Sequence, residues 1–160
     1  MKVNQTMQKK YPGMTLLILL ALLCSACGAK LIRGEPPMVR ISELSHQDDT
    51  VNLQLSIRNV NGEALDIREM NFTVSNEDQQ LLIYNGPATI NIVANGTETW
   101  SVELAENGIT REKLNELQND DINSLPYELD GSIRTLETGK LRFEYKGHLY
   151  TLPGRPGHFR

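Results

Sequence analysis

The strongest constraint on the fold is a strict alternation of apolar and polar residues at positions 51–57. Its apolar positions are Val51, Leu53, Leu55 and Ile57, and its polar positions are Asn52, Gln54 and Ser56. A period of two places all four apolar side chains on one face of a β-strand. Their burial stabilises a fold by roughly 6 to 12 kcal/mol, before the entropy of ordering the chain is subtracted. The alternation therefore predicts a central strand with one face in a hydrophobic core.

Stretches with the same alternation recur along the chain. They lie at 88–92, 100–104, 127–133 and 141–145, with shorter ones at 38–44, 80–84 and 148–152. Tight turns are predicted where residues tolerate positive φ angles, at Asn61-Gly62, Asn85-Gly86, Asn95-Gly96, Asn107-Gly108 and Lys146-Gly147. Strands separated by such turns predict an all-β fold, a β-sandwich of about seven to eight strands.

The alternation slips by one residue near Arg68 and Glu69. The apolar positions are Leu65 and Ile67 before the slip, and Met70, Phe72 and Val74 after it. A β-bulge or a strand that switches from one sheet to the other explains such a slip.

Two further segments depart from the strand pattern. Asp130-Gly131 interrupts a regular run, and we interpret it as a bulge or a close backbone contact rather than a turn. Residues 110–118 favour a short helix, with Thr110 as its cap and with Leu114 and Leu117 facing the core. We expect this helix to bridge the two sheets.

The first 27 residues have the order of a secretory signal peptide. Lys9 and Lys10 precede an apolar run from Met14 to Leu23, and small residues follow it. Ten apolar residues suit a signal peptide but fall short of the ~20 that are needed to span a bilayer. The pattern therefore predicts export and cleavage, and it disfavours a lasting transmembrane helix.

The residue after the predicted cleavage site is Cys27. A small residue followed by cysteine resembles the lipobox of bacterial lipoproteins, with Cys24 standing three places earlier, where leucine is usual. The resemblance implies that Cys27 becomes the mature N-terminus and carries acyl chains such as palmitate, which anchor it to a membrane. Gly28 at the next position implies sorting to the outer membrane. The alternative is ordinary cleavage after Ala26, which leaves Cys27 as a free thiol.

Length and composition fit one folded domain behind this N-terminal region. The chain has 160 residues, of which 39% are hydrophobic and 22% are charged, and this composition excludes intrinsic disorder. We expect a signal peptide at 1–26, a lipidated tether at 27–37, the β-sandwich at 38–152 and a flexible C-terminal tail at 153–160.

The charge of the chain is unfavourable for a nucleic-acid partner. Three of its 16 basic residues, Lys2, Lys9 and Lys10, would leave with the signal peptide, so 13 basic and 20 acidic residues would remain. A face that binds phosphates needs a basic excess. The basic patch with an aromatic residue is the tail 153–160, for which contact with anionic lipid, peptidoglycan or a protein and simple fraying are the alternatives.

A second resemblance covers residues 38–152. It rests on Leu55-Ser56-Ile57-Arg58-Asn59-Val60-Asn61, on Leu65-Asp66-Ile67 and on Tyr127-Glu128-Leu129-Asp130-Gly131. These segments are similar to the late-embryogenesis-abundant (LEA) type 2 family, whose domain is also called the water-stress and hypersensitive-response (WHy) domain. Val60 replaces the proline of the family's Asn-Pro-Asn motif. The resemblance implies an immunoglobulin/fibronectin III-like sandwich with one short helix and a stress-associated, non-enzymatic protein.

The residues that could carry catalysis or bind a metal form no recognisable constellation. His46, His148 and His158 are expected in a loop, beside a turn and in the tail, without the spacing of metal ligands. Ser45-His46-Gln47-Asp48 has the residue types of a hydrolytic triad, but sequence neighbours rarely reach triad geometry. Asn119-Asp120-Asp121 lacks the spaced oxygens of a calcium loop. We therefore expect no catalytic residue, no metal site and no cofactor.

These observations predict a non-enzymatic lipoprotein of the bacterial cell envelope, anchored through Cys27 on the periplasmic face of the outer membrane. One hypothesis is that it protects or binds envelope components under desiccation or osmotic stress. The alternative is an accessory or scaffold subunit that docks on an envelope assembly or transport machine through a strand edge or the tail. The expected partners are the membrane and another envelope protein.

Overall fold

The computed structural model describes residues 34–47, 49–136 and 138–160. The predicted signal peptide at 1–26 and the lipidation site at Cys27 lie outside the described residues. Strand β1 begins at Met38, where the domain was predicted to start, and the last strand ends at Phe159.

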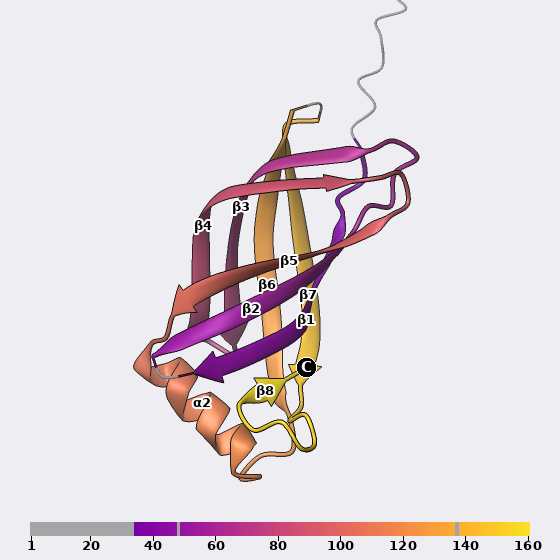
Figure 1. The fold of residues 1–160 in the computed structure, drawn as a ribbon. Coiled ribbons are helices and arrows are strands. Elements are labelled where there is room, and N and C mark those ends of the chain that lie inside the picture. The colour runs from indigo at the N-terminus through magenta and orange to yellow at the C-terminus, as the bar shows by residue number, and fades with distance from the viewer. Residues whose placement is uncertain (1–33, 48, 137) are drawn as a thin grey trace, which may run out of the picture. The chain divides into compact units, whose positions relative to one another are not determined.

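Eight strands form two antiparallel sheets of four strands each, which are packed face to face (Figure 1). The first sheet has the order β5-β2-β1-β8, with β5 at Thr97–Ala105, β2 at Thr50–Arg58, β1 at Met38–Gln47 and β8 at His158–Phe159. The second has the order β4-β3-β6-β7, with β4 at Gln79–Ile92, β3 at Leu65–Asn76, β6 at Leu125–Thr135 and β7 at Lys140–Leu149. The predicted all-β sandwich of about eight strands with one helix is confirmed.

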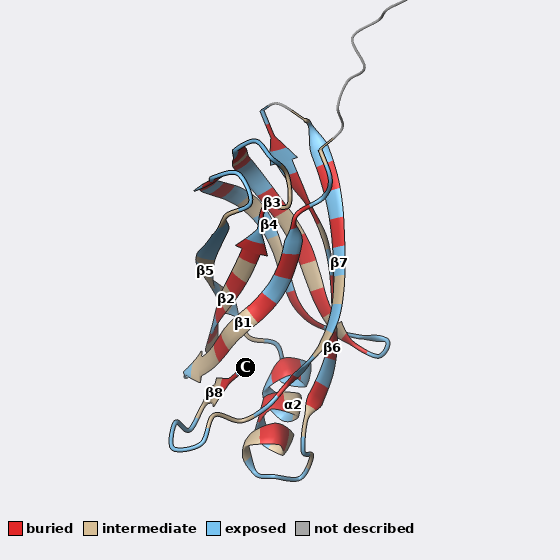
Figure 2. Ribbon diagram, turned by 90° about the vertical axis from the view of Figure 1, so that its right-hand side faces the viewer, coloured by how far each residue is buried: buried red, intermediate tan, exposed pale blue. Residues whose placement is uncertain are grey.

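The hydrophobic core lies between the two sheets, and strand β2 is central as predicted. Val51, Leu53, Leu55 and Ile57 are all fully buried. Buried and more exposed residues alternate along the strands, as Figure 2 shows in red against tan and blue. Most side chains on the outer face of each sheet are therefore polar, and Ile83 in β4 is an exposed apolar exception.

Strand β3 contains the predicted slip of the alternation. The register shifts between Ile67 and Glu69 in the pairing with both β4 and β6. Because β3 remains in the same sheet on both sides of this shift, the irregularity is a bulge rather than a change of sheet.

Gly131 confirms the second interpretation, a close backbone contact. Strand β6 pairs through Gly131 without a register shift. A Cβ atom there would come within 2.5 Å of the Asn71 carbonyl oxygen and of the Phe143 ring. Glycine is therefore the residue that lets the ring of Phe143 pack against the strand.

Two of the predicted turns are wrong. Asn85-Gly86 lies inside β4, and Lys146-Gly147 lies inside β7. At both glycines an added Cβ would come within 2.8 Å of a tyrosine side chain, Tyr84 at Gly86 and Tyr127 at Gly147. Each glycine can lie within a strand because the neighbouring tyrosine ring packs over it and fills the place of the missing side chain.

The three remaining Asn-Gly pairs lie outside the strands, and the turn predicted at Asn107-Gly108 is instead the start of the helix. Asn61-Gly62 and Asn95-Gly96 are in the β2–β3 and β4–β5 connections, and Asn95 has a φ of 56°. The β3–β4 turn uses Glu77, whose φ is 52°. Glutamate has no marked preference for positive φ, so the sequence did not point to this turn.

Helix α2, at Gly108–Gln118, connects β5 of one sheet to β6 of the other, as predicted. Its N-cap is Asn107 and not Thr110, because the Asn107 side chain accepts a hydrogen bond from the Thr110 N–H at 2.8 Å. Thr110 is buried instead, and its hydroxyl donates to the Leu81 carbonyl of β4 at 2.6 Å. Leu114 and Leu117 are buried, as predicted.

The prediction of a flexible tail at 153–160 is wrong. His158–Phe159 forms strand β8, which pairs with Leu44 and Ser45 of β1. Tyr150 and Arg160 exchange two backbone hydrogen bonds, and the Phe159 side chain is buried in the core. The proline- and glycine-rich composition of the segment therefore encodes a turn that returns Phe159 to the core.

Asn59 follows the end of β2, is fully buried and joins two loops. Its Nδ2 donates to the carbonyl oxygens of Glu63 at 2.7 Å and Val93 at 3.1 Å. Its Oδ1 accepts from the Asn61 N–H at 3.0 Å, and its own backbone N–H donates to the Gly96 carbonyl at 2.9 Å. One side-chain amide thus fixes the β2–β3 loop against the β4–β5 turn.

We expect Phe159→Ala to lower the free energy of unfolding by about 3 to 5 kcal/mol, because it leaves a cavity in the core. Tyr150→Ala, at a side chain that is about half exposed, should cost less than about 1 kcal/mol. Urea denaturation of the two variants measures both values. If Phe159→Ala lowered the free energy of unfolding no more than Tyr150→Ala, the C-terminal segment would not be part of the core and the prediction of a flexible tail would stand.

We expect Asn59→Asp to lower the free energy of unfolding by about 2 kcal/mol or more, because a carboxylate oxygen would replace the donor that faces buried carbonyl groups. Asn61→Asp makes the same chemical change where water can replace the lost donor, and should cost less than about 1 kcal/mol. Denaturant titrations that gave the two variants equal midpoints would contradict the central role of Asn59.

Candidate functional site

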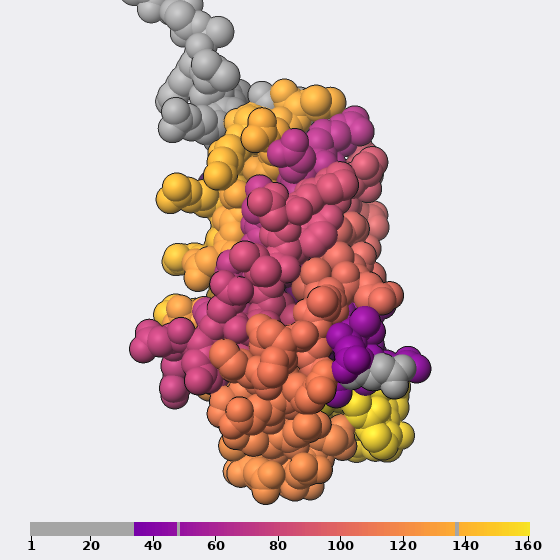
Figure 3. Space-filling model, turned by 90° about the vertical axis from the view of Figure 1, so that its left-hand side faces the viewer, coloured from indigo at the N-terminus to yellow at the C-terminus, as the bar shows by residue number. Residues whose placement is uncertain are grey.

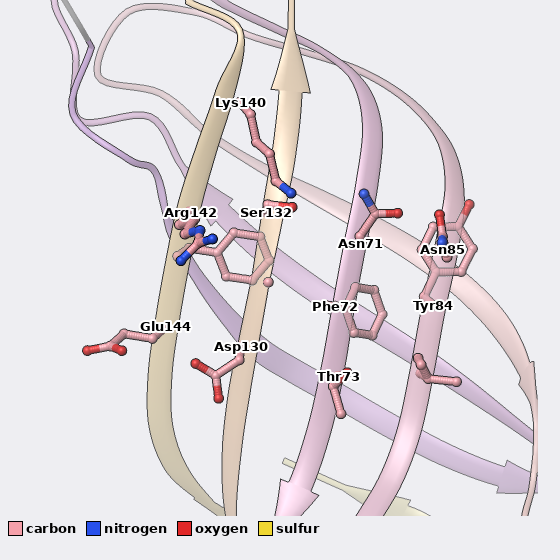
Figure 4. Close-up of a pocket in the computed structure, with 13 residues that line it drawn as sticks. Asn71, Phe72, Thr73, Tyr84, Asn85, Asp130, Ser132, Lys140, Arg142 and Glu144 are labelled. Atoms are coloured by element: carbon pink, nitrogen blue, oxygen red, sulfur yellow. The ribbon is translucent and has the colours of Figure 1, made fainter.

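A hollow of about 610 Å³ lies over the outer face of the β4-β3-β6-β7 sheet (Figure 4). Cross-strand register places the side chains that line it in rows, and in two of these rows all of them are polar except Ile83. One row is Asn85, Asn71, Ser132 and Arg142, and the next is Ile83, Thr73, Asp130 and Glu144. Lys140 lies beside the first row, two residues from Arg142. We call this set of residues the polar hollow.

Charge is unevenly distributed in the polar hollow. In Figure 4, Lys140 and Arg142 lie toward one end, and Asp130 and Glu144 lie toward the other. In the part of the chain that the structure describes, neither cation forms an ion pair, whereas the neighbouring Arg134 pairs with Glu69 at 3.0 Å. The hollow therefore offers hydrogen bonds from amides and hydroxyl groups, with a positive and a negative end.

The structure brings two of the three histidines onto neighbouring strands, where the sequence placed them in a loop and a tail. His46 lies in β1, with its Nε2 3.1 Å from Glu106 Oε1. His158 lies in β8, with its Nδ1 2.8 Å from Glu43 Oε1. His148 lies apart from them, in β7.

The Ser45-His46 pair does not assemble a hydrolytic site. Both residues are in β1, where successive side chains point to opposite faces of the sheet. Ser45 is opposite His158 in the register, which places these two on the outer face. Asp48 lies outside the described residues.

Asn119-Asp120-Asp121 follows the end of helix α2. The Asn119 N–H donates to the Asn115 carbonyl at 2.9 Å, and Asp120 has a φ of 60°. Over residues 34–47, 49–136 and 138–160, no cluster of three or more histidine, cysteine or acidic residues could hold a metal ion.

A polar cluster surrounds Glu106, and no sequence motif predicts it because its members come from separate segments. The Glu106 side chain is completely buried, and its Oε2 accepts a hydrogen bond from Arg111 Nε at 2.9 Å. Arg111 also binds Asp49 in the β1–β2 turn. Hydrogen bonds with Glu106 and Asp49 raise the pKa of Arg111 above its usual value. This cluster connects the start of helix α2 to the β1–β2 turn.

The chain joins the sandwich at one defined end. The Glu35 N–H donates to Asn61 Oδ1 at 2.8 Å, and Asn61 Nδ2 donates to the Glu35 carbonyl at 2.9 Å. We call this end, with the β2–β3, β4–β5 and β6–β7 connections, the loop end. Helix α2, the β3–β4 turn and β8 lie at the opposite end, which we call the helix end (Figures 1 and 3).

No helix among the described residues is both long and apolar enough to cross a membrane.

Comparison with known proteins relates the chain to others through its fold. No family model matches it, and no curated protein matches it. Its structure is similar to the solution structure of a protein from Arabidopsis thaliana, with a TM-score of 0.58 and 14% sequence identity over 82% of this chain and 93% of that chain.

Two further solved structures resemble it more distantly. A crystal structure of a protein from Archaeoglobus fulgidus has a TM-score of 0.46 and 9% identity over 71% of this chain and 95% of that chain. The solution structure of a candidate late embryogenesis abundant (LEA) protein has a TM-score of 0.41 and 15% identity over 88% of each chain. The Arabidopsis thaliana likeness shows that the sandwich fold is shared.

Proposed function

We propose that the chain is a lipid-anchored, non-enzymatic protein of the bacterial cell envelope that binds or protects envelope components under desiccation or osmotic stress. The observation that carries the proposal is the position of Cys27. It stands eight residues before Glu35, whose backbone is held to the loop end by Asn61. An acylated Cys27 would therefore hold the folded domain close to a membrane surface.

The residues around the anchor support the proposed compartment. Lipobox-like residues before Cys27 favour acylation after export, and Gly28 favours the periplasmic face of the outer membrane over the inner membrane. Several acyl chains on one residue would anchor the protein almost irreversibly.

The stress-related part of the proposal is supported by the resemblance to the LEA type 2 family. The asparagines of the motif have a structural role here, because Asn59 fixes two loops and Asn61 holds the chain at Glu35. The polar hollow supplies the surface for binding. Its amides, its hydroxyl groups and its two cations, which form no ion pair within the described residues, suit a hydrophilic ligand with hydroxyl or charged groups.

A second candidate function is that of an accessory subunit on an envelope machine, and the edge of β1 favours it. Strand β8 pairs only with Leu44 and Ser45, so within the described residues the edge of β1 before them has no strand partner. Such an edge can accept an extended segment of another protein. The Tyr127 hydroxyl hydrogen-bonds with the backbone of Ile41 in β1, and burial raises the pKa of Tyr127 to about 12.

Affinity purification of the anchored protein, from cells grown at normal and at high osmolarity, separates the two functions. The protective function predicts no stoichiometric protein partner that is retained under both conditions. A partner recovered at equal stoichiometry in both would replace it with the accessory function.

For the anchor, we expect Cys27→Ser to abolish incorporation of a labelled fatty acid and to leave an unprocessed precursor or a soluble periplasmic form, because serine cannot form the thioether. The ten-residue apolar run is too short to hold the chain in the membrane by itself. Metabolic labelling combined with cell fractionation measures both effects.

Cys24→Ser is the matched control, since it makes the same change three residues away, within the predicted signal peptide. It should still be processed and labelled. Fatty-acid label that persisted in Cys27→Ser, or that was lost only in Cys24→Ser, would show that Cys27 is not the acylated residue.

A further inference from the structure

Three of the most exposed large apolar side chains lie at the loop end. Met38, Val93 and Leu136 are 58%, 63% and 68% exposed, whereas the apolar residues that alternate inward along the strands are mostly buried. Each comes from a different segment: the first residue of β1, the β4–β5 turn and the β6–β7 turn.

The register of the sheets places these segments at the same end of the sandwich. Met38 is opposite Arg58, which is opposite Thr97, so these residues form the last row of the first sheet. Val93 directly follows β4, and its carbonyl accepts a hydrogen bond from the Gly96 N–H at 2.9 Å within the turn that leads to Thr97. In the second sheet, Thr135, which precedes Leu136, is opposite Ile67 near the start of β3.

The chain that precedes the domain joins it at this same end, through the Glu35–Asn61 hydrogen bonds. Glu35 lies eight positions after Cys27, and eight steps of extended chain span at most about 26 to 29 Å. Strand β4 alone has 14 residues, or about 46 Å along the strand. A chain anchored at Cys27 would therefore keep the loop end nearer to the bilayer than the helix end.

The distribution of charge also favours the loop end as the end that faces the membrane. From Glu103 to Asp121 the chain carries six acidic and two basic residues, and Glu77 and Asp78 in the β3–β4 turn add two more acidic groups at the helix end. Arg155 and Arg160, which flank β8 at the same end, add two basic groups, so an acidic excess remains there. The loop end carries both signs, and the exposed Arg58 lies directly across from Met38. An anionic membrane surface would repel the helix end and tolerate the loop end.

We infer that the loop end is a membrane-contacting surface, on which Met38, Val93 and Leu136 enter the headgroup region of an anionic bilayer and orient the domain with its helix end away from the membrane. This inference rests on the proposed anchor at Cys27. The anchor supplies the affinity, because it keeps the loop end at a high effective concentration near the lipid. Three apolar side chains are then enough to select an orientation.

The test uses the full-length, acylated protein in vesicles of phosphatidylethanolamine and phosphatidylglycerol. The chain has two cysteines, Cys24 in the predicted signal peptide and Cys27 at the proposed anchor. In the acylated protein, after cleavage of the signal peptide, neither is a free thiol. A single introduced cysteine can therefore carry an environment-sensitive fluorophore. We would label Val93→Cys and Leu136→Cys, with Ile83→Cys as the matched control. Ile83 is also apolar and 58% exposed, but it faces the polar hollow.

Probes at Val93 and Leu136 should be quenched by brominated lipid and lose about half or more of their quenching by aqueous iodide, as expected for groups within roughly 5 to 10 Å of the acyl boundary. The probe at Ile83 should remain open to iodide. Met38→Asp should restore iodide access to the probe at Val93, because a charge would leave the lipid, whereas Asn85→Asp in the polar hollow should not.

The outcomes separate this inference from the proposed function. Protein that carried labelled fatty acid and co-floated with vesicles, yet left Val93, Leu136 and Ile83 equally open to iodide, would overturn the membrane-contacting surface while preserving the anchor. Protein that failed to co-float would overturn both.

Discussion

The buried side chain of Asn59 is the interaction on which the arrangement of the loop end depends. Its amide satisfies carbonyl groups from the β2–β3 loop and the β4–β5 turn and orients Asn61, which in turn holds Glu35. An apolar residue of similar size would fill the space but leave these carbonyls without donors, and buried polar groups without partners are costly. One residue thus determines both how two loops meet and where the preceding chain joins the domain.

The sequence predicted best those features that depend on a periodic pattern. The four apolar residues of β2, the slip near Glu69 and the close contact at Gly131 all follow from the period of two, and each is found. Features that depend on partners distant in the chain were missed. Gly86 and Gly147 are typical turn residues by sequence, but in the structure tyrosine rings cover them within strands. The C-terminal residues have the composition of a tail, but Phe159 packs in the core.

The candidate site was less predictable than the fold for the same reason. Asn85, Asn71, Ser132 and Arg142 form a row only because four strands are in register, and nothing within any one strand marks them as neighbours. The same holds for Glu106, whose partner Arg111 also reaches Asp49 in a distant turn. The asparagines 59 and 61 could be singled out because they are close in sequence and belong to a recognisable motif.

The bulge in β3 links the fold to the chemistry of the polar hollow. Before it, the odd-numbered residues Leu65 and Ile67 face the core, whereas after it the even-numbered Met70 and Phe72 do. Without the extra residue the phase would not change, so Asn71 and Thr73 would point into the core and apolar side chains would face outward. The irregularity therefore places the amide of Asn71 at the centre of the row that Ser132 and Arg142 continue. Because this row lies on the outer face of a sheet and the chain joins at the loop end, a ligand in the hollow and a membrane at the loop end would use different surfaces of the domain.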